Sequence, residues 1–345
     1  MSTYLDFPKP WLFLAPMDGV ADWAFREVCY RFGADITVSE LVSVGGVINC
    51  PQRVLPEIGA RHGARPFIVQ LVGHRPEEFR RAARIVTDSL PVVGIDINMG
   101  CPTALVVGSG NGSALLRNPA LAAEIVAATC AGTHLPVSVK LRSGWDRPNL
   151  PEWAPLLEAA GAQLLSVHGR TREQQFGGTA DHEVIAAVKR VVHIPVVGNG
   201  DIVSSATARA MLETTSVDGL MVGRGAKGNP WLFAELQAEL KSSDSYRQQS
   251  ISFGDVIREQ SRLTFADQGP RKAPMAIRKH LAGYSRNSPS AAVLRAALKT
   301  LFSWDDVEGW IAKLEASFGQ TPPKMDAPDR LGFGNRVGLG GFDER

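Results

Sequence analysis

The stretch Gly94-Ile95-Asp96-Ile97-Asn98-Met99-Gly100-Cys101-Pro102 decides the fold and places a thiol within it. Val92 and Val93 lead into this stretch, so the sequence predicts a buried strand that ends at a Gly-Cys-Pro turn. Parallel α/β proteins keep their chemistry at the carboxyl ends of their strands, which is where Cys101 falls. A cysteine in an apolar strand is more often an inert hydrophobe, but this one lies in a loop between glycine and proline. We therefore interpret Cys101 as a candidate reactive residue.

The composition is that of a globular protein. The chain has 345 residues, of which 44% are hydrophobic and 21% charged, enough for a large core and a second small domain. No apolar run approaches the roughly 18 residues of a membrane span, and the amino terminus lacks the features of a secretory leader, so we expect a cytoplasmic protein. The four cysteines show no metal-site spacing, so no metal is expected. A monomer is the default expectation, because no heptads or large apolar surface can be identified.

Short apolar runs rich in Val, Ile and Leu alternate with helical patterns up to about residue 240. Eight such runs separated by crossover helices predict an α/β fold of the closed parallel (β/α)8 type, a TIM barrel. An open, doubly wound sheet is the alternative, because strand order is not written in one sequence. The predicted strands are 11–15, 35–39, 67–71, 94–98, 136–141, 164–168, 195–199 and 218–222, and the helices include 23–32, 76–88, 119–130, 152–160, 182–191, 204–212 and 230–240.

Polar residues follow almost every predicted strand. In a (β/α)8 barrel these positions lie on one face around one pocket, and their repetition is stronger evidence than any single motif. They are Pro16 to Gly19, Ser39-Glu40, Gln70, Asn98 to Cys101, Lys140 to Arg142, His168 to Thr171, Asn199 to Asp201 and Gly223 to Gly225.

Lys140 is predicted to point into the barrel mouth, because Val137 and Val139 pack on the opposite side of its strand. A lysine there is costly unless it faces an anion, an electron-rich ring or a carbonyl substrate. Two functions compete for it: the nucleophile of a Schiff-base aldolase, or a cation held against a cofactor that becomes anionic on reduction. A lysine that extends to solvent fits less well, because Arg142 follows with the same facing.

Glycine-rich turns close the last two predicted strands. Gly198-Asn199-Gly200-Asp201 and Gly223-Arg224-Gly225 bring backbone N–H groups to the place where this fold commonly binds phosphate, so they favour a phosphorylated ligand. His168 could act as a base, bind a ligand or ligate a metal. Metal is the poorest interpretation, because no second histidine or carboxylate stands at ligand spacing.

The pattern changes after residue 240. Residues 241–245 resemble a linker, and only helical periodicity follows, to about residue 318. From Arg247 to Lys299 ten basic and three acidic side chains give a net charge of +7, against +2 for the whole chain. We therefore predict a barrel domain at 1–240, a small basic all-α domain at 241–320 and a flexible Gly/Pro-rich tail at 321–345.

These residues together resemble the tRNA-dihydrouridine synthases. The resemblance runs from about Trp11 to Phe318 and includes the basic run Arg278-Lys279-His280-Leu281. Its other motifs are Ala15-Pro16-Met17-Asp18-Gly19-Val20, Gln70, Ile97-Asn98-Met99-Gly100-Cys101-Pro102, Gly112-Ser113-Ala114-Leu115-Leu116, Val139-Lys140-Leu141-Arg142, Val167-His168-Gly169-Arg170-Thr171-Arg172, Asn199-Gly200-Asp201 and Gly223-Arg224.

The resemblance implies an FMN-dependent enzyme that takes hydride from NADPH and reduces the C5–C6 double bond of a uridine in tRNA, in the D-loop, to 5,6-dihydrouridine. Hydride would pass from flavin N5 to uracil C6, and Cys101 would protonate C5 as general acid. The uridine would have to leave its stack to reach a barrel mouth. Asn98 and Arg142 are implied to hold the uracil, and Arg278 and Lys279 to bind tRNA. The implied cofactor-binding residues are Pro16, Met17, Asp18, Gln70, Lys140, His168, Asn199, Gly200, Asp201, Gly223 and Arg224.

The chain departs from the family pattern after its cysteine. Relatives commonly have lysine three residues beyond it, where this chain has Ala104, so a loop expected to meet RNA has lost a cation. Phe176 stands where relatives often have tyrosine. Some motifs resemble those of the B subfamily and others those of the C subfamily, so the sequence does not identify the target uridine.

Three other functions fit parts of the pattern. A small-molecule pyrimidine oxidoreductase on a flavin barrel would share the FMN residues but have no use for the basic helices. A Schiff-base aldolase would use Lys140 and be colourless. A non-catalytic RNA-binding protein would keep the barrel as scaffold and would not need Cys101.

Overall fold

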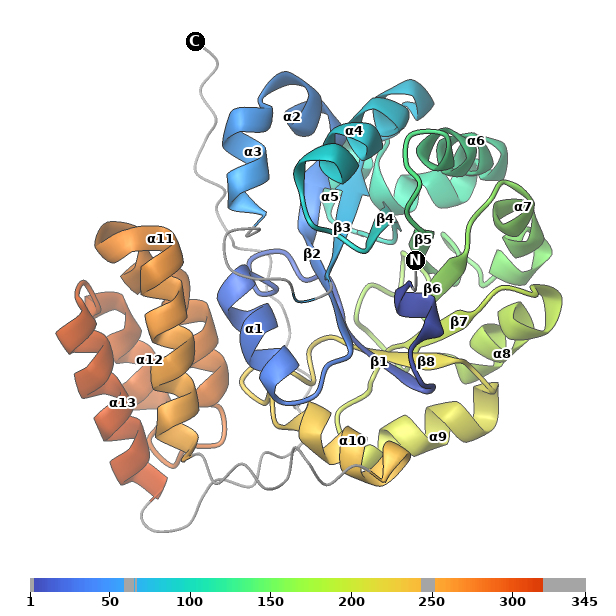
Figure 1. Cartoon of the computed structure of the whole chain (residues 1–345). Coiled ribbons are helices and arrows are strands. Elements are labelled where there is room, and N and C mark those ends of the chain that lie inside the picture. Colours follow the sequence, from blue (N-terminus) through green and yellow to red (C-terminus); the bar gives the residue numbers. More distant parts are fainter. Residues whose placement is uncertain (1–2, 59–64, 66, 243–251, 319–345) are drawn as a thin grey trace.

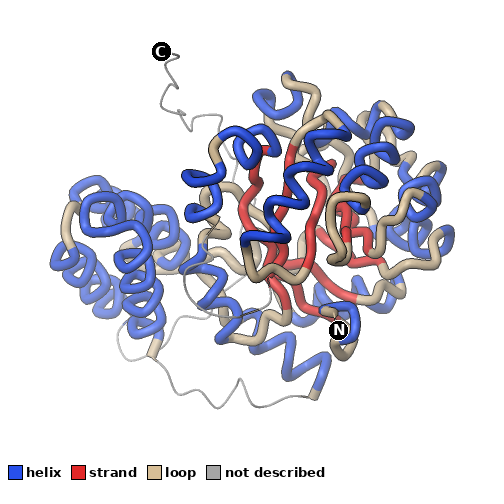
Figure 2. Tube along the Cα trace, turned by 45° about the horizontal axis from the view of Figure 1, so that its top comes forward, coloured by secondary structure: helices blue, strands red, loops and turns tan. Residues whose placement is uncertain are grey.

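Eight parallel strands close into a barrel, which confirms the predicted (β/α)8 fold (Figures 1 and 2). The computed structural model describes residues 3–58, 65, 67–242 and 252–318. The open-sheet alternative is wrong, because β1 pairs with β8 as well as with β2, in a register that joins Trp11 to Gly219 and Leu14 to Val222. The strands are β1 (Trp11–Leu14), β2 (Ile36–Ser43), β3 (Phe67–Val72), β4 (Gly94–Met99), β5 (Val137–Arg142), β6 (Leu164–His168), β7 (Val196–Asn199) and β8 (Gly219–Val222).

Two apolar layers hold the barrel. The inner layer fills the lower interior with Trp11, Phe13, Ile36, Ile68 and Met221, together with Tyr4 from the short 3-10 helix η1 (Tyr4–Asp6). The outer layer, made by the alternate strand residues, packs against the surrounding helices. The barrel is therefore a filled core, and only its upper end is available for polar side chains.

The crossover helices cover the barrel from outside. The barrel helices are α1 (Trp23–Arg31), α2 (Val44–Asn49), α3 (Pro51–Glu57), α4 (Pro76–Ser89), α5 (Ala104–Gly108), α6 (Pro119–Cys130), α7 (Ala154–Ala159), α8 (His182–Val191), α9 (Ser205–Thr215) and α10 (Leu232–Lys241), with 3-10 turns η2 (Gly112–Arg117) and η3 (Leu150–Glu152).

Three of these helices were absent from the sequence prediction. α2 contains Gly45 and Gly46, α3 begins directly behind it at Pro51, and α5 is only five residues long. Glycine and β-branched residues are weak helix formers, so such segments owe their structure to packing. In α2 that packing is visible, because Val44 and Val47 are buried in the barrel core.

A helical region follows the barrel, as predicted, and stands to one side of it (Figures 1 and 2). It comprises α11 (Phe253–Tyr284), α12 (Ala291–Ala297), the turn η5 (Leu298–Thr300) and α13 (Trp304–Phe318). Its own core contains Ile277, Leu281, Tyr284 and Trp310. α11 is interrupted at Gly269, which has a φ of 73° that an L-residue rarely adopts and which precedes Pro270.

The helical region contacts the barrel through α1. The buried His280 of α11 lies with its Nε2 2.8 Å from Oδ2 of Asp22, the residue that caps α1, and its ring stands 5.1 Å from that of Phe25. Lys279 reaches the same carboxylate at 3.2 Å. Burial opposes ionisation of Asp22, but His280 and Lys279 reverse the effect and hold its pKa far below the usual range.

Part of the predicted linker and the whole predicted tail at 321–345 lie outside the described residues, so the domain boundaries stay predictions. No helix in the described part of the chain is long and apolar enough to span a membrane. Among the same residues, no three His, Cys, Asp or Glu side chains gather as a metal site would need.

Candidate active site at the barrel mouth

The structure brings the predicted site residues of the barrel to the carboxyl ends of its strands. Strand register sets their layers: Gln70, Asp96 and Ser138 are neighbours across β3, β4 and β5, and Asn98 and Lys140 are neighbours one layer higher. Because side chains two apart on a strand share a face, Asp96 and Asn98 point to the same side of β4, and Ser138, Lys140 and Arg142 to the same side of β5. Pro16 and Met17 follow β1 directly, while Asp18 is exposed at the rim.

Hydrogen bonds fix the backbone on both sides of Cys101. The Cys101 and Gly100 N–H groups donate to Oδ1 of Asn98 at 3.0 and 3.2 Å. The Cys101 carbonyl accepts from the N–H and the Oγ of the buried Ser113 at 3.1 and 2.9 Å. The thiol itself is partly exposed and lies 3.3 Å from Oγ1 of Thr103. A reactive group held on such a backbone can act on a bound ring without a prior rearrangement of its loop.

Lys140 lies partly buried beside the end of β7. Its Nζ donates to Oδ1 of Asn199 at 3.0 Å, and Nδ2 of Asn199 donates to the Met221 carbonyl at 2.7 Å. Burial, together with the charge of Arg142, lowers the pKa of Lys140 to about 8, so the ammonium form predominates at neutral pH and is lost at a lower pH than in a free lysine. A lysine in this state favours an anionic partner that restores the ammonium form.

Arg142 braces the loop that follows β6. Its Nη1 donates to the carbonyls of Thr171 and Gln175 at 2.9 and 2.7 Å, and its Nε donates to the Gly100 carbonyl at 2.9 Å. Burial and the neighbouring Arg170 lower the pKa of Arg142 to about 10. A thiolate at Cys101 would raise the pKa values of both Lys140 and Arg142, which places the three side chains around one space.

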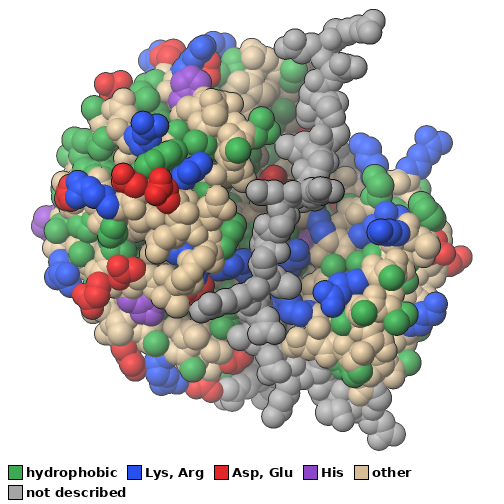
Figure 3. Space-filling model, turned by 180° about the vertical axis from the view of Figure 1, so that it is seen from behind, with side chains coloured by type: hydrophobic (Ala, Val, Ile, Leu, Met, Phe, Trp, Pro, Cys, Tyr) green, Lys and Arg blue, Asp and Glu red, His purple; other side chains and the backbone are tan. Residues whose placement is uncertain are grey.

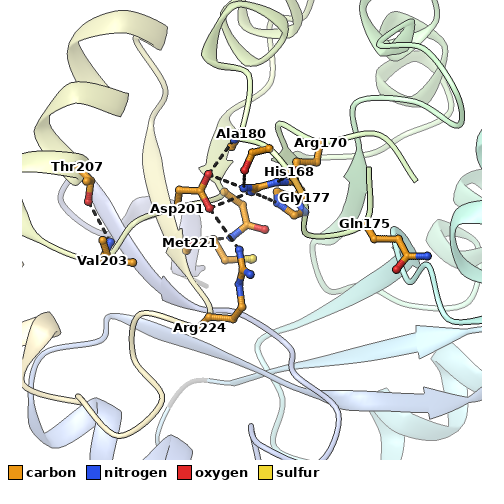
Figure 4. Close-up of polar contacts among 12 residues, drawn as sticks. His168, Arg170, Gln175, Gly177, Ala180, Asp201, Val203, Thr207, Met221 and Arg224 are labelled. Atoms are coloured by element: carbon orange, nitrogen blue, oxygen red, sulfur yellow. Dashed lines mark hydrogen bonds and ion pairs between the residues drawn. The ribbon is translucent and has the colours of Figure 1, made fainter. Parts of the chain in front are cut away.

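A buried arginine joins the ends of β6 and β7 (Figure 4). The Arg170 guanidinium binds both carboxylate oxygens of Asp201 at 2.9 and 2.8 Å and donates to the carbonyls of Gly177 and Gly178. Arg224 reaches the same carboxylate at 3.3 Å. Although burial favours the neutral acid, these contacts leave the pKa of Asp201 below its ordinary value. Asp201 therefore orients the guanidinium groups of Arg170 and Arg224, and its own negative charge would not contact a phosphate directly.

His168 is neutral in this setting. Burial is the main cause of a pKa well below the usual value, and the charges of Arg142, Lys140, Arg170 and Arg224 lower it further. Its Nε2 lies 3.4 Å from Nη1 of Arg170, and because a guanidinium can only donate, Nε2 accepts and the proton resides on Nδ1. Four cations around a neutral histidine make this end of the barrel suited to an anionic ligand.

The two predicted glycine turns differ in their surroundings. Gly200 has a φ of 123°, and a Cβ there would lie 2.5 Å from Cβ of Ala180 and 3.0 Å from Cδ2 of His168. Only glycine fits that position. At Gly223 a Cβ would make only ordinary van der Waals contact, 3.7 Å from Ala15 and 3.8 Å from Met17 in the β1 loop, so no close neighbour requires glycine there.

The two predicted tRNA contacts of the helical region are partly engaged elsewhere. Nη2 of Arg278 donates to the Leu301 carbonyl at 2.5 Å, and its guanidinium lies 5.4 Å from the ring of Phe302, which is 73% exposed. Lys279 pairs with Asp22, as described above. Arg271 and Lys272, nearer the start of the second part of α11, are exposed. The rim helix α5 carries the exposed Ala104 and Leu105 next to the Cys101 loop.

Sequence reasoning missed two residues that the structure puts in the site. Arg170 belongs to the motif Val167 to Arg172 after β6, and the two arginines of that motif were a signal that could have identified it. Its partner Asp201, however, lies 31 residues away in the sequence. Asp96 lies in the strand that precedes Cys101 and was assigned no role from the sequence alone. A buried carboxyl in an apolar strand was the signal that could have identified it.

Comparisons with known proteins identify the family. The dihydrouridine synthase (Dus) family matches residues 13–317. A probable tRNA-dihydrouridine synthase of Rickettsia conorii is 38% identical over 90% of this chain and 95% of its own length. A tRNA-dihydrouridine synthase B of Pseudomonas putida is 37% identical, over 93% and 95%, and a probable tRNA-dihydrouridine synthase of Rhodobacter capsulatus 40%, over 84% and 90%. With its closed barrel and a family match over nearly its whole length, the chain belongs to the dihydrouridine synthase family.

Proposed function

We propose that the protein binds FMN in the barrel mouth and uses NADPH to reduce the C5–C6 double bond of a uridine in tRNA, with Cys101 as the general acid. Membership of the dihydrouridine synthase family makes it a flavin-dependent oxidoreductase that acts on tRNA. The proposal of FMN, NADPH and Cys101 rests on two features that meet in the barrel mouth. Four cations surround His168, and the Cys101 thiol is carried by a hydrogen-bonded loop near Lys140.

The chemistry of the donor set fits FMN. Arg224 supplies a cation for a phosphate, and the backbone N–H groups of Gly200 and Gly223 would be further donors. Lys140 supplies a cation whose lowered pKa favours an electron-rich ring. Gln70, almost fully buried, supplies an amide, while Pro16, Met17 and Asp18 would form the wall on the β1 side. Asn199 would keep Lys140 in place through the 3.0 Å hydrogen bond between them.

The residues of the chain divide the work of the reaction. When bound and reduced by NADPH, FMN supplies the hydride that adds to C6 of the uracil ring. Cys101 would give the proton of its Sγ to C5, and the resulting thiolate would be stabilised by Lys140 and Arg142 until it regains a proton from solvent. Asn98 and Arg142 would hold the uracil carbonyls with the N–H groups that their own hydrogen bonds leave free.

The helical region supports a tRNA substrate. Figure 3 shows Lys and Arg side chains gathered on it, with few acidic ones among them. We assign phosphate binding chiefly to the exposed Arg271 and Lys272, with Arg278 beside them on α11. Lys279 would contribute by docking α11 on the barrel. RNA is then recognised mainly through its shape and backbone, and the uridine leaves its stack to enter the mouth.

The experiment that tests this function is a visible spectrum of the purified protein, acid release of its ligand, and incubation with NADPH and unmodified tRNA. A yellow protein that releases FMN and forms dihydrouridine is expected. A colourless protein that takes up no added FMN would overturn the proposal, and trapping of substrate on Lys140 by borohydride would then point to an aldolase. Reduction of free pyrimidines with no gain from tRNA would point to a small-molecule oxidoreductase.

Replacing Arg271 with glutamine is expected to weaken the binding of all tRNA sequences to the same extent, because one phosphate contact is lost. The slope of the logarithm of the association constant against the logarithm of the salt concentration should become smaller by about 1. Turnover at saturating tRNA should stay unchanged. The matched control is Arg190→Gln, the same change at an exposed arginine of α8, across the barrel from α11 (Figure 1). An equal loss of affinity in the control would show that net charge, and not the α11 surface, determines binding.

A further inference from the structure

We propose that Asp96 is a positioning residue: it fixes the accepting end of a chain of hydrogen bonds that runs through Gln70 and Asn98 to the backbone of the Cys101 loop. The side chain is 2% exposed and lies one layer below Asn98 and Lys140, beneath the reacting groups. The inference rests on the proposed function only in taking Cys101 as the general acid.

The chain is continuous over three strands. Asp96 on β4 accepts from Nε2 of Gln70 on β3 at 2.7 Å and from Oγ of Ser138 on β5 at 2.6 Å. Oε1 of Gln70 then accepts from Nδ2 of Asn98 at 2.7 Å. Oδ1 of Asn98 in turn accepts the Cys101 and Gly100 N–H groups. The links between side chains join buried groups, so water offers little competition for them, whereas the last link reaches the partly buried backbone of the Cys101 loop.

Both ends give the chain its direction: the Gly100 and Cys101 N–H groups can only donate, and the Asp96 carboxylate can only accept. Either amide could turn over and exchange its oxygen for its nitrogen, but an ionised carboxylate accepts and never donates. The Asp96 carboxylate therefore requires Gln70 to place its Nε2 towards Asp96 and its Oε1 towards Asn98. Asn98 must then present its oxygen to the Cys101 loop. A turned Asn98 would place an N–H against two backbone N–H groups, which leaves buried donors unpaired.

The same direction determines what the mouth offers a ligand. Each primary amide has two N–H bonds, and the chain uses one from Gln70 and one from Asn98. The second N–H of Asn98 is left for the mouth, so the site presents a donor to a carbonyl oxygen, whereas Gln70 keeps its nitrogen turned towards Asp96. Asp96 thus couples the order of the Cys101 loop to the preference of the site for a carbonyl-bearing ring.

Protonation of Asp96 removes this constraint, because a carboxylic acid can also donate. Burial raises the pKa of Asp96 to about 6, against the hydrogen bonds of Ser138 and Gln70 and the charge of Lys140 on β5. The other titratable group that faces it is the buried phenol of Tyr4, whose pKa Asp96 helps to raise. The carboxylate is the main form at neutral pH, and the protonated acid becomes the main form below about pH 6.

Amide hydrogen exchange at Gly100 and Cys101 in the flavin-free protein tests the proposal without any turnover. Asp96→Asn is expected to speed exchange at both amides by about tenfold to a hundredfold, because an amide at 96 accepts either orientation of Gln70. Ser138→Ala is the matched control: it removes the other partner of Asp96 but not the direction of the chain. It should leave both amides protected.

A charge swap separates direction from general damage. In Asp96→Asn with Gln70→Glu, Asn at 96 donates to Glu at 70, which again accepts from Asn98, so protection of both amides should return while the amide donor of Gln70 stays lost. In the wild type, protection corrected for intrinsic exchange should fall as the pH drops from 7 to 5, and in Asp96→Asn it should not.

Two results would overturn the inference: unchanged exchange in Asp96→Asn, or equal loss in Ser138→Ala. If Asp96→Asn fails to fold, the pH dependence in the wild type decides, and a flat profile would also overturn it. None of these three results affects the proposed function, which flavin release and tRNA reduction test separately.

Discussion

Replacing Cys101 with alanine is expected to lower the turnover of tRNA by about 10²–10⁴-fold, the usual contribution of a positioned general acid. The flavin content of the purified protein should stay unchanged, because the substitution removes only the thiol. The loop is held by hydrogen bonds from the backbone of residue 101 to Asn98 and Ser113, which alanine can also make. The measurement is single-turnover dihydrouridine formation with flavin reduced beforehand, so that loss of the proton step is separated from loss of hydride supply.

The control for Cys101 is Cys50→Ala, the change of an exposed thiol at the start of α3. It should leave turnover unchanged. Full turnover in Cys101→Ala would contradict the general-acid role, and RNA binding without any turnover in the wild type would favour a non-catalytic RNA-binding protein.

Replacing Lys140 with methionine is expected to weaken flavin binding by about tenfold to a hundredfold, because a charge-assisted contact is lost and the Asn199 oxygen loses its donor. Methionine has a similar length and preserves packing, so the loss reports the charge. Titration of the flavin-free protein with FMN, followed by flavin fluorescence, measures it. Lys272→Met on the helical region is the control and should bind FMN normally.

The pH dependence of flavin binding gives the same test without a substitution. The pKa of Lys140 is about 8 in the structure, and an anionic partner stabilises the ammonium form and so raises the pKa in the complex. Affinity should therefore be constant below pH 8 and fall as the pH rises above it, while Lys140→Met should show no such fall. A flat wild-type profile between pH 7 and 9 would show that Lys140 does not face the bound anion.

The fold could be predicted because its signals are local. Each strand is an apolar run closed by a turn, and polar residues at the run ends identified Cys101, Lys140 and His168 as neighbours before any coordinates. The short helices α2 and α5 could not be predicted, because tertiary packing stabilises them against poor propensity.

The site could be predicted only as a list of residues, because partners distant in sequence decide what each side chain does. Asp201 resembles a free carboxylate in sequence, yet Arg170 and Arg224 engage it. Lys279 was predicted to bind tRNA, but the structure pairs it with Asp22, 257 residues earlier, and its contact with tRNA stays a prediction. Asp96 lies in the strand before Cys101, but its contact with Gln70 depends on a strand register that cannot be inferred from local sequence patterns.

The pairing of β1 with β8 has a consequence for how the chain folds during synthesis. One edge of β1 pairs with β2, but the other pairs only with β8, so the hydrogen bonds of that second edge cannot form before residues near 220 are available. Contacts of such long sequence separation slow folding and leave an unpaired strand edge exposed meanwhile. A ribosome-bound chain that stops short of Val222 is therefore the species most exposed to aggregation and to chaperone capture.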